Sequence, residues 1–257
     1  RRSRNLVLVP TTSGSGSEAT HFAVVYIGEE KFSIAGPAMR PDHVVLDPLL
    51  ALSGSSHQRA TSGIDALCQS IESLWAVAAT DESRRYARHA LSLVSRNIRP
   101  FVHEPDESTA RAMCIGSHLA GRAIDIPKTT AAHALSYAIT KKYGIPHGNA
   151  VALTLGVFHE HHEQLLDESD ATPSRVMLLL GHALSVIEDE LEPRPTFRRW
   201  LHDLLIDLRL VAALPAAEKD LEALSRGVNP ERLSNNPVAV DEETIRELLR
   251  RGAYDTP

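Results

Sequence analysis

The pattern of apolar residues changes near residue 54, and this change limits the possible folds. Before it, short segments rich in Val, Ile and Phe are separated by Gly, Pro or Ser, a pattern typical of strands and turns. After it, apolar residues recur with the period of an α-helix over long segments. We expect strands at 5–9, 21–27, 31–35 and 44–47, and helices near 57–77, 81–98, 107–122, 129–142, 147–164, 174–191 and 195–208. The carboxylates of Asp241, Glu242 and Glu243 predict the start of a last helix.

The strand-like part is too small to form a complete sheet. Three or four short strands would leave an exposed face and an unpaired edge, so we expect more of an α/β domain upstream of Arg1. Nucleotide-binding folds usually begin with a strand and a glycine-rich turn, yet neither GxGxxG nor a Walker-type loop occurs in these 257 residues. Part of any dinucleotide site is therefore expected to lie outside this sequence.

The composition limits the class of protein and its partners. A hydrophobic content of 43% is ample for a globular core, and a net charge of −6 argues against binding to nucleic acid. There is no apolar run of about 18 residues and no signal-peptide pattern after Arg1, so we predict a cytoplasmic protein without a membrane partner. Cys68 and Cys114 lie in separate helical segments and are expected to be buried thiols rather than a disulfide.

Two segments contain polar residues that could carry chemistry. Residues 10–18 (PTTSGSGSE) follow a strand, and such a turn can present backbone N–H groups and hydroxyls to a phosphate or ribose. A flexible turn would explain the same residues. Further along, Asp65, Gln69 and Glu72 share one face of a helix. Burying them is costly unless they are paired or coordinate something, so they indicate either hydrogen bonding or a metal site.

A third segment contains two histidines. His133 lies in a helix of small and apolar residues, and His147 follows Pro146 at the expected start of the next helix. A single histidine there would more often be a hydrogen-bonded core residue. Together with Asp65, however, the two histidines provide the mixed nitrogen and oxygen donors of a divalent-metal site.

These motifs resemble, in order and over nearly the whole chain, the iron-containing (group III) alcohol dehydrogenases. The motifs are PTTSGSGSE at 10–18, GIDAL at 63–67, the His133-to-His147 spacing with Pro-His-Gly, and RLSNNP at 232–237. The resemblance implies an α/β nucleotide-binding domain followed by an all-α metal-binding domain, the dehydroquinate synthase-like fold. Residues 1–54 would be the C-terminal remnant of the cofactor domain, and residues 55–257 the helical catalytic domain.

The resemblance also implies a set of metal ligands, namely Asp65, Gln69, His133 and His147. The family usually has histidine at position 69; because an amide oxygen is a weaker donor than imidazole, harder ions should lose less affinity. Fe2+ is the expected metal and Zn2+ the alternative, acting as a Lewis acid on an aldehyde. Tyr137 stands where the family often has another histidine, and it is the candidate catalytic residue. Its presence there leaves water or the cofactor ribose as the expected proton source.

The implied second cofactor is NADH or NADPH. By position in the family, the residues expected to hold it are Thr11, Thr12, Ser17, Lys31 and Leu49. A homo-oligomer is expected because members of the family are commonly oligomeric.

Residues 65–75 and 123–137 are similar to a branch of the family that reduces phosphonoacetaldehyde to 2-hydroxyethylphosphonate. Arg122 and Lys128 would then bind the phosphonate dianion; the alternative for each is an ordinary surface cation. One alternative is a generic iron-type dehydrogenase for uncharged short-chain aldehydes. Another is a truncated, non-catalytic member that only binds metal or a partner.

The histidine-rich run 159–163 (HEHHE) also invites a metal hypothesis. We interpret its alternating glutamates and the polar residues after it as a solvated helix end. No role is assigned to His159, His161 or His162 on this basis.

Overall fold

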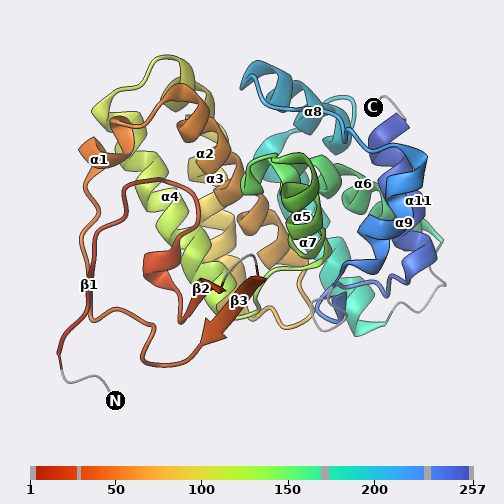
Figure 1. The fold of residues 1–257 in the computed structure, drawn as a ribbon, viewed down its shortest axis with the longest axis horizontal. Coiled ribbons are helices and arrows are strands. Elements are labelled where there is room, and N and C mark those ends of the chain that lie inside the picture. The colour runs from red at the N-terminus through yellow and green to blue at the C-terminus, as the bar shows by residue number, and fades with distance from the viewer. Residues whose placement is uncertain (1–3, 28–29, 169–173, 229–232, 255–257) are drawn as a thin grey trace.

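The computed structural model describes the chain apart from residues 1–3, 28–29, 169–173, 229–232 and 255–257 (Figure 1). Its strands are β1 (Val7–Leu8), β2 (Phe22–Ile27), β3 (Glu30–Ala35) and β4 (His43–Val44), with a 3-10 helix, η1, at Ser17–Ala19. Its helices are α1 (Pro48–Leu52), α2 (Ser56–Trp75), α3 (Asp81–His103), α4 (Glu107–Asp125), α5 (Ala131–Tyr143), α6 (His147–Asp167), α7 (Arg175–Leu191), α8 (Phe197–Asp207), α9 (Glu218–Arg226) and α11 (Glu242–Tyr254).

The N-terminal part forms two small pieces of sheet. β1 pairs in parallel with β4, with Val7 opposite His43, and β2 and β3 form an antiparallel hairpin. Parallel pairing is typical of α/β domains, whose sheets are normally covered on both faces. Here Val7, Val9 and Val45 are about half exposed. The structure therefore contains the expected fragment of sheet, with apolar side chains at its surface.

Helices α2, α3 and α4 begin at capping residues. The side chain of Ser55 accepts a hydrogen bond from the backbone N–H of Gln58 at the start of α2. Thr80 and Asp106 form reciprocal capping boxes at the starts of α3 and α4. Such side chains satisfy backbone N–H groups that have no partner within the helix, and so they stabilise its first turn. The predicted starts of α3 and α4 are confirmed, and that of α2 differs by one residue.

Helix α2 runs through the centre of the helical part. It packs against α3, α4, α6 and α7, and every residue from Gly63 to Trp75 is buried. A helix that is buried on all sides presents its polar residues to other helices rather than to water. Asp65, Gln69 and Glu72 therefore lie inside the protein, where each needs a partner.

The N-terminal segment is docked on α4. Gly16 and Gly121 touch backbone to backbone, and a Cβ at Gly121 would lie only 2.2 Å from the carbonyl oxygen of Gly16. The buried carboxylate of Glu18 pairs with His118 Nδ1 at 3.1 Å. Asp125, at the end of α4, accepts a hydrogen bond from the His21 backbone N–H at 2.7 Å and pairs with Arg40. These contacts hold the glycine-rich segment 10–18 against the helical part.

The remaining elements differ little from expectation. The short helices α1 and α9 were not predicted, since their few residues show too little periodicity. The predicted strands at 5–9 and 44–47 are shorter in the structure, where only two residues of each pair. Cys68 and Cys114 are buried free thiols, as predicted. Among the described residues, none of the helices combines the length and apolar character that a membrane span requires.

Candidate metal centre

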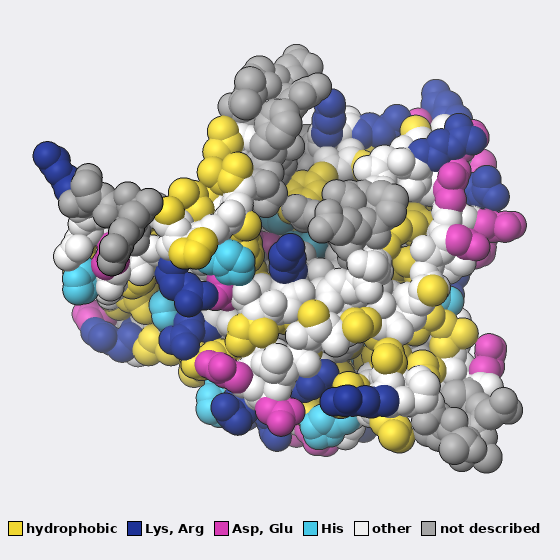
Figure 2. All heavy atoms as spheres, turned by 90° about the horizontal axis from the view of Figure 1, so that it is seen from below, with side chains coloured by type: hydrophobic (Ala, Val, Ile, Leu, Met, Phe, Trp, Pro, Cys, Tyr) yellow, Lys and Arg dark blue, Asp and Glu magenta, His cyan; other side chains and the backbone are white. Residues whose placement is uncertain are grey.

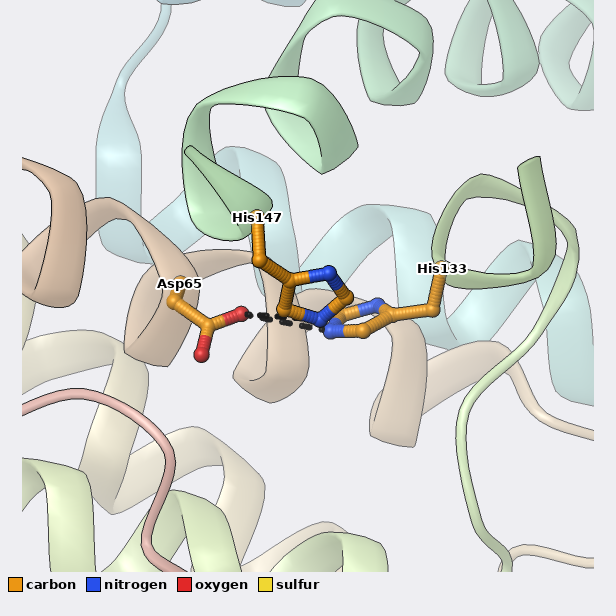
Figure 3. Close-up of side chains that lie close together, drawn as sticks. All are labelled: Asp65, His133 and His147. Carbon is orange, nitrogen blue, oxygen red and sulfur yellow. Dashed lines mark ion pairs between the residues drawn. The ribbon is translucent and has the colours of Figure 1, made fainter. Parts of the chain in front are cut away.

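Three helices bring the predicted metal ligands together. In Figure 3, Asp65 of α2, His133 of α5 and His147 of α6 point toward one another. The Asp65 Oδ1 atom lies 3.4 Å from His133 Nε2 and 4.0 Å from His147 Nε2. One donor atom from each residue falls within 4.8 Å of the others, and no other group of His, Cys, Asp and Glu among the described residues meets this condition.

Glu72 determines how His133 is oriented. The Nδ1–H of His133 donates to Glu72 Oε2, and Glu72 Oε1 accepts from Thr130 Oγ1 at 2.6 Å and from the Thr130 backbone N–H at 3.2 Å. In the neutral ring with Nδ1 carrying the proton, the lone pair of Nε2 faces Asp65. A carboxylate that fixes the tautomer of a metal-binding histidine in this way is a common feature of metal sites.

Ser136 performs the same task for His147. Its hydroxyl donates to the carbonyl oxygen of His133 at 2.7 Å, so its oxygen accepts from His147 Nδ1 at 3.1 Å. His147 Nε2 is therefore also left with a lone pair facing Asp65. Both histidines present the nitrogen that can ligate a metal, and each is held by a neighbour through the other nitrogen.

Gly148 allows α6 to approach α2 closely enough for this arrangement. A Cβ at Gly148 would lie 2.3 Å from the Thr61 carbonyl oxygen and 2.6 Å from Asp65 Cβ. Any larger residue would push the start of α6 away from α2. A glycine at position 148 therefore allows His147 to lie close to Asp65.

Gln69 completes the group. Its Nε2 donates to Asp65 Oδ2 at 3.2 Å, whereas its Oε1 is buried and has no hydrogen-bond partner among the described residues. His133 Nε2, 3.4 Å from Asp65 Oδ1, is a second buried atom without a hydrogen bond in the described part of the chain. Buried polar atoms are rarely left in this state, because each costs the free energy of a lost hydrogen bond. The donor set therefore fits a divalent cation.

The electrostatics of the site also fit a cation. Burial lowers the pKa of His133, but the carboxylates of Glu72 and Asp65 raise it more, to about 9. Burial raises the pKa of Glu72, and the neighbouring His133 and Thr130 bring it below its ordinary value. The region thus favours positive charge, which a proton on His133 supplies when no metal is bound.

Comparison with known proteins agrees with this geometry. The family model described as "Fe-containing alcohol dehydrogenase family, C-terminal" matches residues 59–253, and the model described as "Iron-containing alcohol dehydrogenase" matches residues 1–48. The chain belongs to the iron-containing alcohol dehydrogenase family. The resemblance inferred from the motifs, and the fold that it implied, are confirmed.

Individual relatives define how much of the family fold is present. The chain is 31% identical to a phosphonoacetaldehyde reductase from Streptomyces viridochromogenes, over 95% of this chain and 62% of the relative. The structure of a sulfoacetaldehyde reductase from Bifidobacterium kashiwanohense in complex with NAD+ is similar with a TM-score of 0.81 at 29% identity, over 97% of this chain and 65% of that one. A further iron-containing alcohol dehydrogenase structure has a TM-score of 0.82 at 26% identity, over 100% of this chain and 65% of that one. The chain spans less than two thirds of the length of these relatives.

Tyr137 lies beside the predicted metal ligands. Its ring stacks on that of His147, with centroids 5.3 Å apart and an angle of 22° between the planes. The structure thus brings the predicted catalytic residue to the site. The contact restricts the orientation of the His147 ring, in addition to the hydrogen bond that His147 Nδ1–H donates to Ser136.

The two predicted substrate cations have different surroundings. Arg122 donates to the Tyr86 hydroxyl at 2.6 Å, and its guanidinium lies over the Tyr86 ring. Lys128 is exposed, has the unusual φ of 64°, and lies in the turn that leads from α4 to Thr130. The face drawn in Figure 2 is hollowed near its centre, and histidine and cationic side chains lie in the hollow.

The predicted cofactor residues lie on the docked N-terminal segment. Thr11 and Ser17 are exposed and Thr12 is half-buried, while the neighbouring Ser13 Oγ contacts Cys114 Sγ of α4 at 3.3 Å. Gly14 packs on Ser62, one helical turn before Asp65, so this segment lies near the metal ligands. Leu49 is exposed on α1. Lys31 belongs to β3, and its side chain lies outside the described residues.

The interpretation of the 159–163 run as a solvated helix end is wrong for two of its histidines. His159 and His162 are buried, His159 against Phe197 and His162 against Trp75. Helix α6 continues to Asp167, beyond the end predicted near residue 164, and carries both rings into the core. The metal group defined above does not include them.

Sequence reasoning left the supporting residues of the site without a role. Glu72 was placed on the same face as Asp65 and Gln69, but its partner, His133, is distant in sequence. Ser136, Thr130 and Gly148 gave no separate signal, because a hydroxyl or glycine within a helical segment has many explanations. Spacing along one helix could have identified Glu72; only the packing of helices identifies the others.

Proposed function

We propose that this chain forms the metal-binding part of an NAD(P)-linked, metal-dependent alcohol dehydrogenase that works as an aldehyde reductase. The observation that carries the proposal is the convergence of Asp65 and His133, which are buried, and of the half-buried His147, with both histidine rings oriented by other side chains. The composition of the family supports it, since the matched relatives include dehydrogenases and aldehyde reductases.

The residues that would hold the metal are Asp65, Gln69, His133 and His147. We propose Fe2+ as the ion, with Zn2+ as the alternative. The amide oxygen of Gln69 replaces an imidazole, which weakens binding of borderline ions more than that of hard ones. When bound, the metal supplies Lewis-acid polarisation of a carbonyl group, and the nicotinamide supplies hydride.

The chain's own residues prepare the site for this chemistry. Glu72 and Ser136 keep the Nε2 atoms of His133 and His147 directed at Asp65, so little reorganisation accompanies binding. Tyr137 packs on His147 in place of the family's histidine. The proton required by the reduction is then expected from water or from the cofactor ribose.

The glycine-rich segment is proposed to hold part of NADH or NADPH. Thr11, Thr12 and Ser17 present hydroxyls on a segment docked on α2 and α4, close to the metal ligands. Leu49 and Lys31 are further proposed contacts. The NAD+ complex of the sulfoacetaldehyde reductase supports a nicotinamide cofactor in this fold.

The proposed substrate is a short anionic aldehyde, with phosphonoacetaldehyde as the first choice. Two of the matched relatives are named for anionic aldehydes, one a phosphonate and the other a sulfonate. Lys128 is the better placed cation for such an anion, because it is exposed in the turn just before the helix of His133. Arg122 is already engaged by Tyr86.

The test compares substrates in the protein loaded with Fe2+ or Zn2+. We expect NADH or NADPH oxidation with phosphonoacetaldehyde to exceed that with propanal. We expect Lys128→Ala to raise KM for the phosphonate by about 10- to 100-fold, because that is the loss of affinity expected when one charge-assisted hydrogen bond is removed. KM for propanal should change little.

Lys141→Ala, which removes another exposed lysine from the far end of α5, is the matched control and should change neither substrate. Equal turnover of both aldehydes would favour the generic dehydrogenase. Metal binding without any turnover would favour a non-catalytic member of the family.

A further inference from the structure

The motif at 232–237 has no role in the function proposed above, yet its Asn235 makes an unusual set of contacts. The Asn235 Nδ2 atom donates to the carbonyl oxygens of Pro127, at 2.6 Å, and Thr129, at 3.0 Å. Its Oδ1 accepts from the Ala78 backbone N–H at 3.1 Å, and its own carbonyl oxygen accepts from the Val77 N–H at 3.0 Å. A single residue thus ties together the loop after α2 and the loop before α5.

Both loops lead directly to the residues that orient His133. Thr129 precedes Thr130, whose hydroxyl and N–H donate to Glu72, and Trp75 Nε1 donates to the same hydroxyl at 3.1 Å. Glu72 in turn holds His133 Nδ1. A displacement of the 127–130 loop would therefore move Thr130 relative to Glu72.

We propose that Asn235 is a positioning residue for the metal centre. It acts on His133 indirectly, through Thr130 and Glu72. The proposal rests on the metal-binding function proposed above, and its chemical basis is the planar amide, which satisfies an N–H of one loop and two carbonyl groups of the other.

The test replaces Asn235 with Ala and uses two readouts. Co2+ serves as the probe metal, because its visible absorption reports ligand geometry. We expect the Kd for Co2+ to rise roughly 3- to 10-fold, less than the 10- to 100-fold typical when a direct partner of a ligand is lost, and the absorption spectrum to change. In the metal-free protein, we expect the downfield proton resonance of His133 Nδ1–H, assigned by its loss in Glu72→Gln, to shift or broaden.

Asn236→Ala is the matched control. Asn236 is buried in the same segment, but its side chain bonds His162 and the Val238 carbonyl and reaches neither loop. This variant should lose thermal stability and keep both readouts. If Asn235→Ala does not fold, Asn235→Asp replaces it, since Asp keeps the acceptor for Ala78 and removes the donor to Pro127 and Thr129.

Wild-type absorption and proton resonance in an Asn235 variant that has only lost stability would overturn the proposal. A wild-type chain that fails to bind Co2+ would instead count against the metal-binding function. The proton resonance of the metal-free protein decides the role of Asn235 in that case too.

Discussion

His133 and His162 are both almost completely buried, yet their surroundings have opposite effects on their charge. His133 lies between the carboxylates of Glu72 and Asp65, which raise its pKa to about 9 despite its burial. His162 lies among Trp75, Phe158 and the amide of Asn236. Its burial, together with the nearby His159 and His161, lowers its pKa well below the ordinary value.

The comparison shows that burial of a histidine does not by itself identify a metal site. At His162 the neutral ring is the stable form, and it can serve as a packing residue. At His133 the two carboxylates stabilise positive charge. A metal ion that binds there can therefore take the place of the proton, which is released to water. The carboxylates beside His133 can only accept hydrogen bonds, so they suit that site to a cation. His162 has no such carboxylate among its ring and amide neighbours and is part of the core.

The largest expected effect comes from removing each ring in turn. We expect His133→Ala to weaken Zn2+ binding by more than about 100-fold, because it removes a ligand rather than a partner of one. His162→Ala should leave Zn2+ binding within about threefold of wild type while lowering the free energy of unfolding by about 2–4 kcal/mol, as expected for truncating a buried ring. Isothermal titration with Zn2+ and chemical denaturation measure the two quantities. Similar losses of Zn2+ binding in both variants would remove the distinction between the sites.

A smaller effect is expected from Gly148→Ala, which tests how closely α6 must approach α2. The added Cβ would meet the Thr61 carbonyl oxygen and Asp65, so we expect His147 to move and Zn2+ binding to weaken by about tenfold or more, with about 1–3 kcal/mol of destabilisation. Gly181→Ala in α7 is the control. Its Cβ would meet only Leu166 at 4.0 Å, so it should bind Zn2+ normally and be neutral or slightly more stable. Normal Zn2+ binding by Gly148→Ala would show that the close approach is not required.

The smallest effect is a pH dependence of opposite sign at the two histidines. In the metal-free protein, His133 contributes stability that is fully present below pH 6.5 and lost as pH rises through about 9, because the native state keeps a proton that the unfolded state has released. His162 contributes stability that is lost as pH falls below 6.5, since only the unfolded state then takes up the proton. Each slope is limited to about 1.4 kcal/mol per pH unit.

Denaturation over the range from pH 5 to about 10 measures both slopes. We expect Glu72→Gln to flatten the alkaline decline and His162→Gln to flatten the acidic one. Saturating Zn2+ should abolish the alkaline decline, because the metal takes the place of the proton. An alkaline decline that survives in Glu72→Gln would mean that His133 is not its source.

Much of the architecture was predictable because local rules govern it. The starts of α3 and α4 follow from Thr80, Asp106 and the carboxylates beside them, whereas both helices continue beyond their predicted ends at 98 and 122, to His103 and Asp125. The grouping of Asp65, His133 and His147 was predicted, because an acid and two histidines on apolar helices supply the donors of a metal site and the family resemblance pointed to the same residues. The exposure of His159 and His162, near the end of α6, was predicted wrongly. Glutamates next to them in the sequence point to other faces of the helix and do not report whether another helix covers the histidines.

Most of the helices, the residues that could hold a metal, and the family of the chain follow from patterns in the sequence. These properties depend on neighbours within a few turns or on motifs that stand in the chain. Three further features depend on how the elements pack. Glu72 holds His133, Gly148 allows His147 to approach Asp65, and Asn235 links two loops behind the site. Each of these contacts joins residues on separate elements, and distances between elements are determined by packing, which no local pattern encodes.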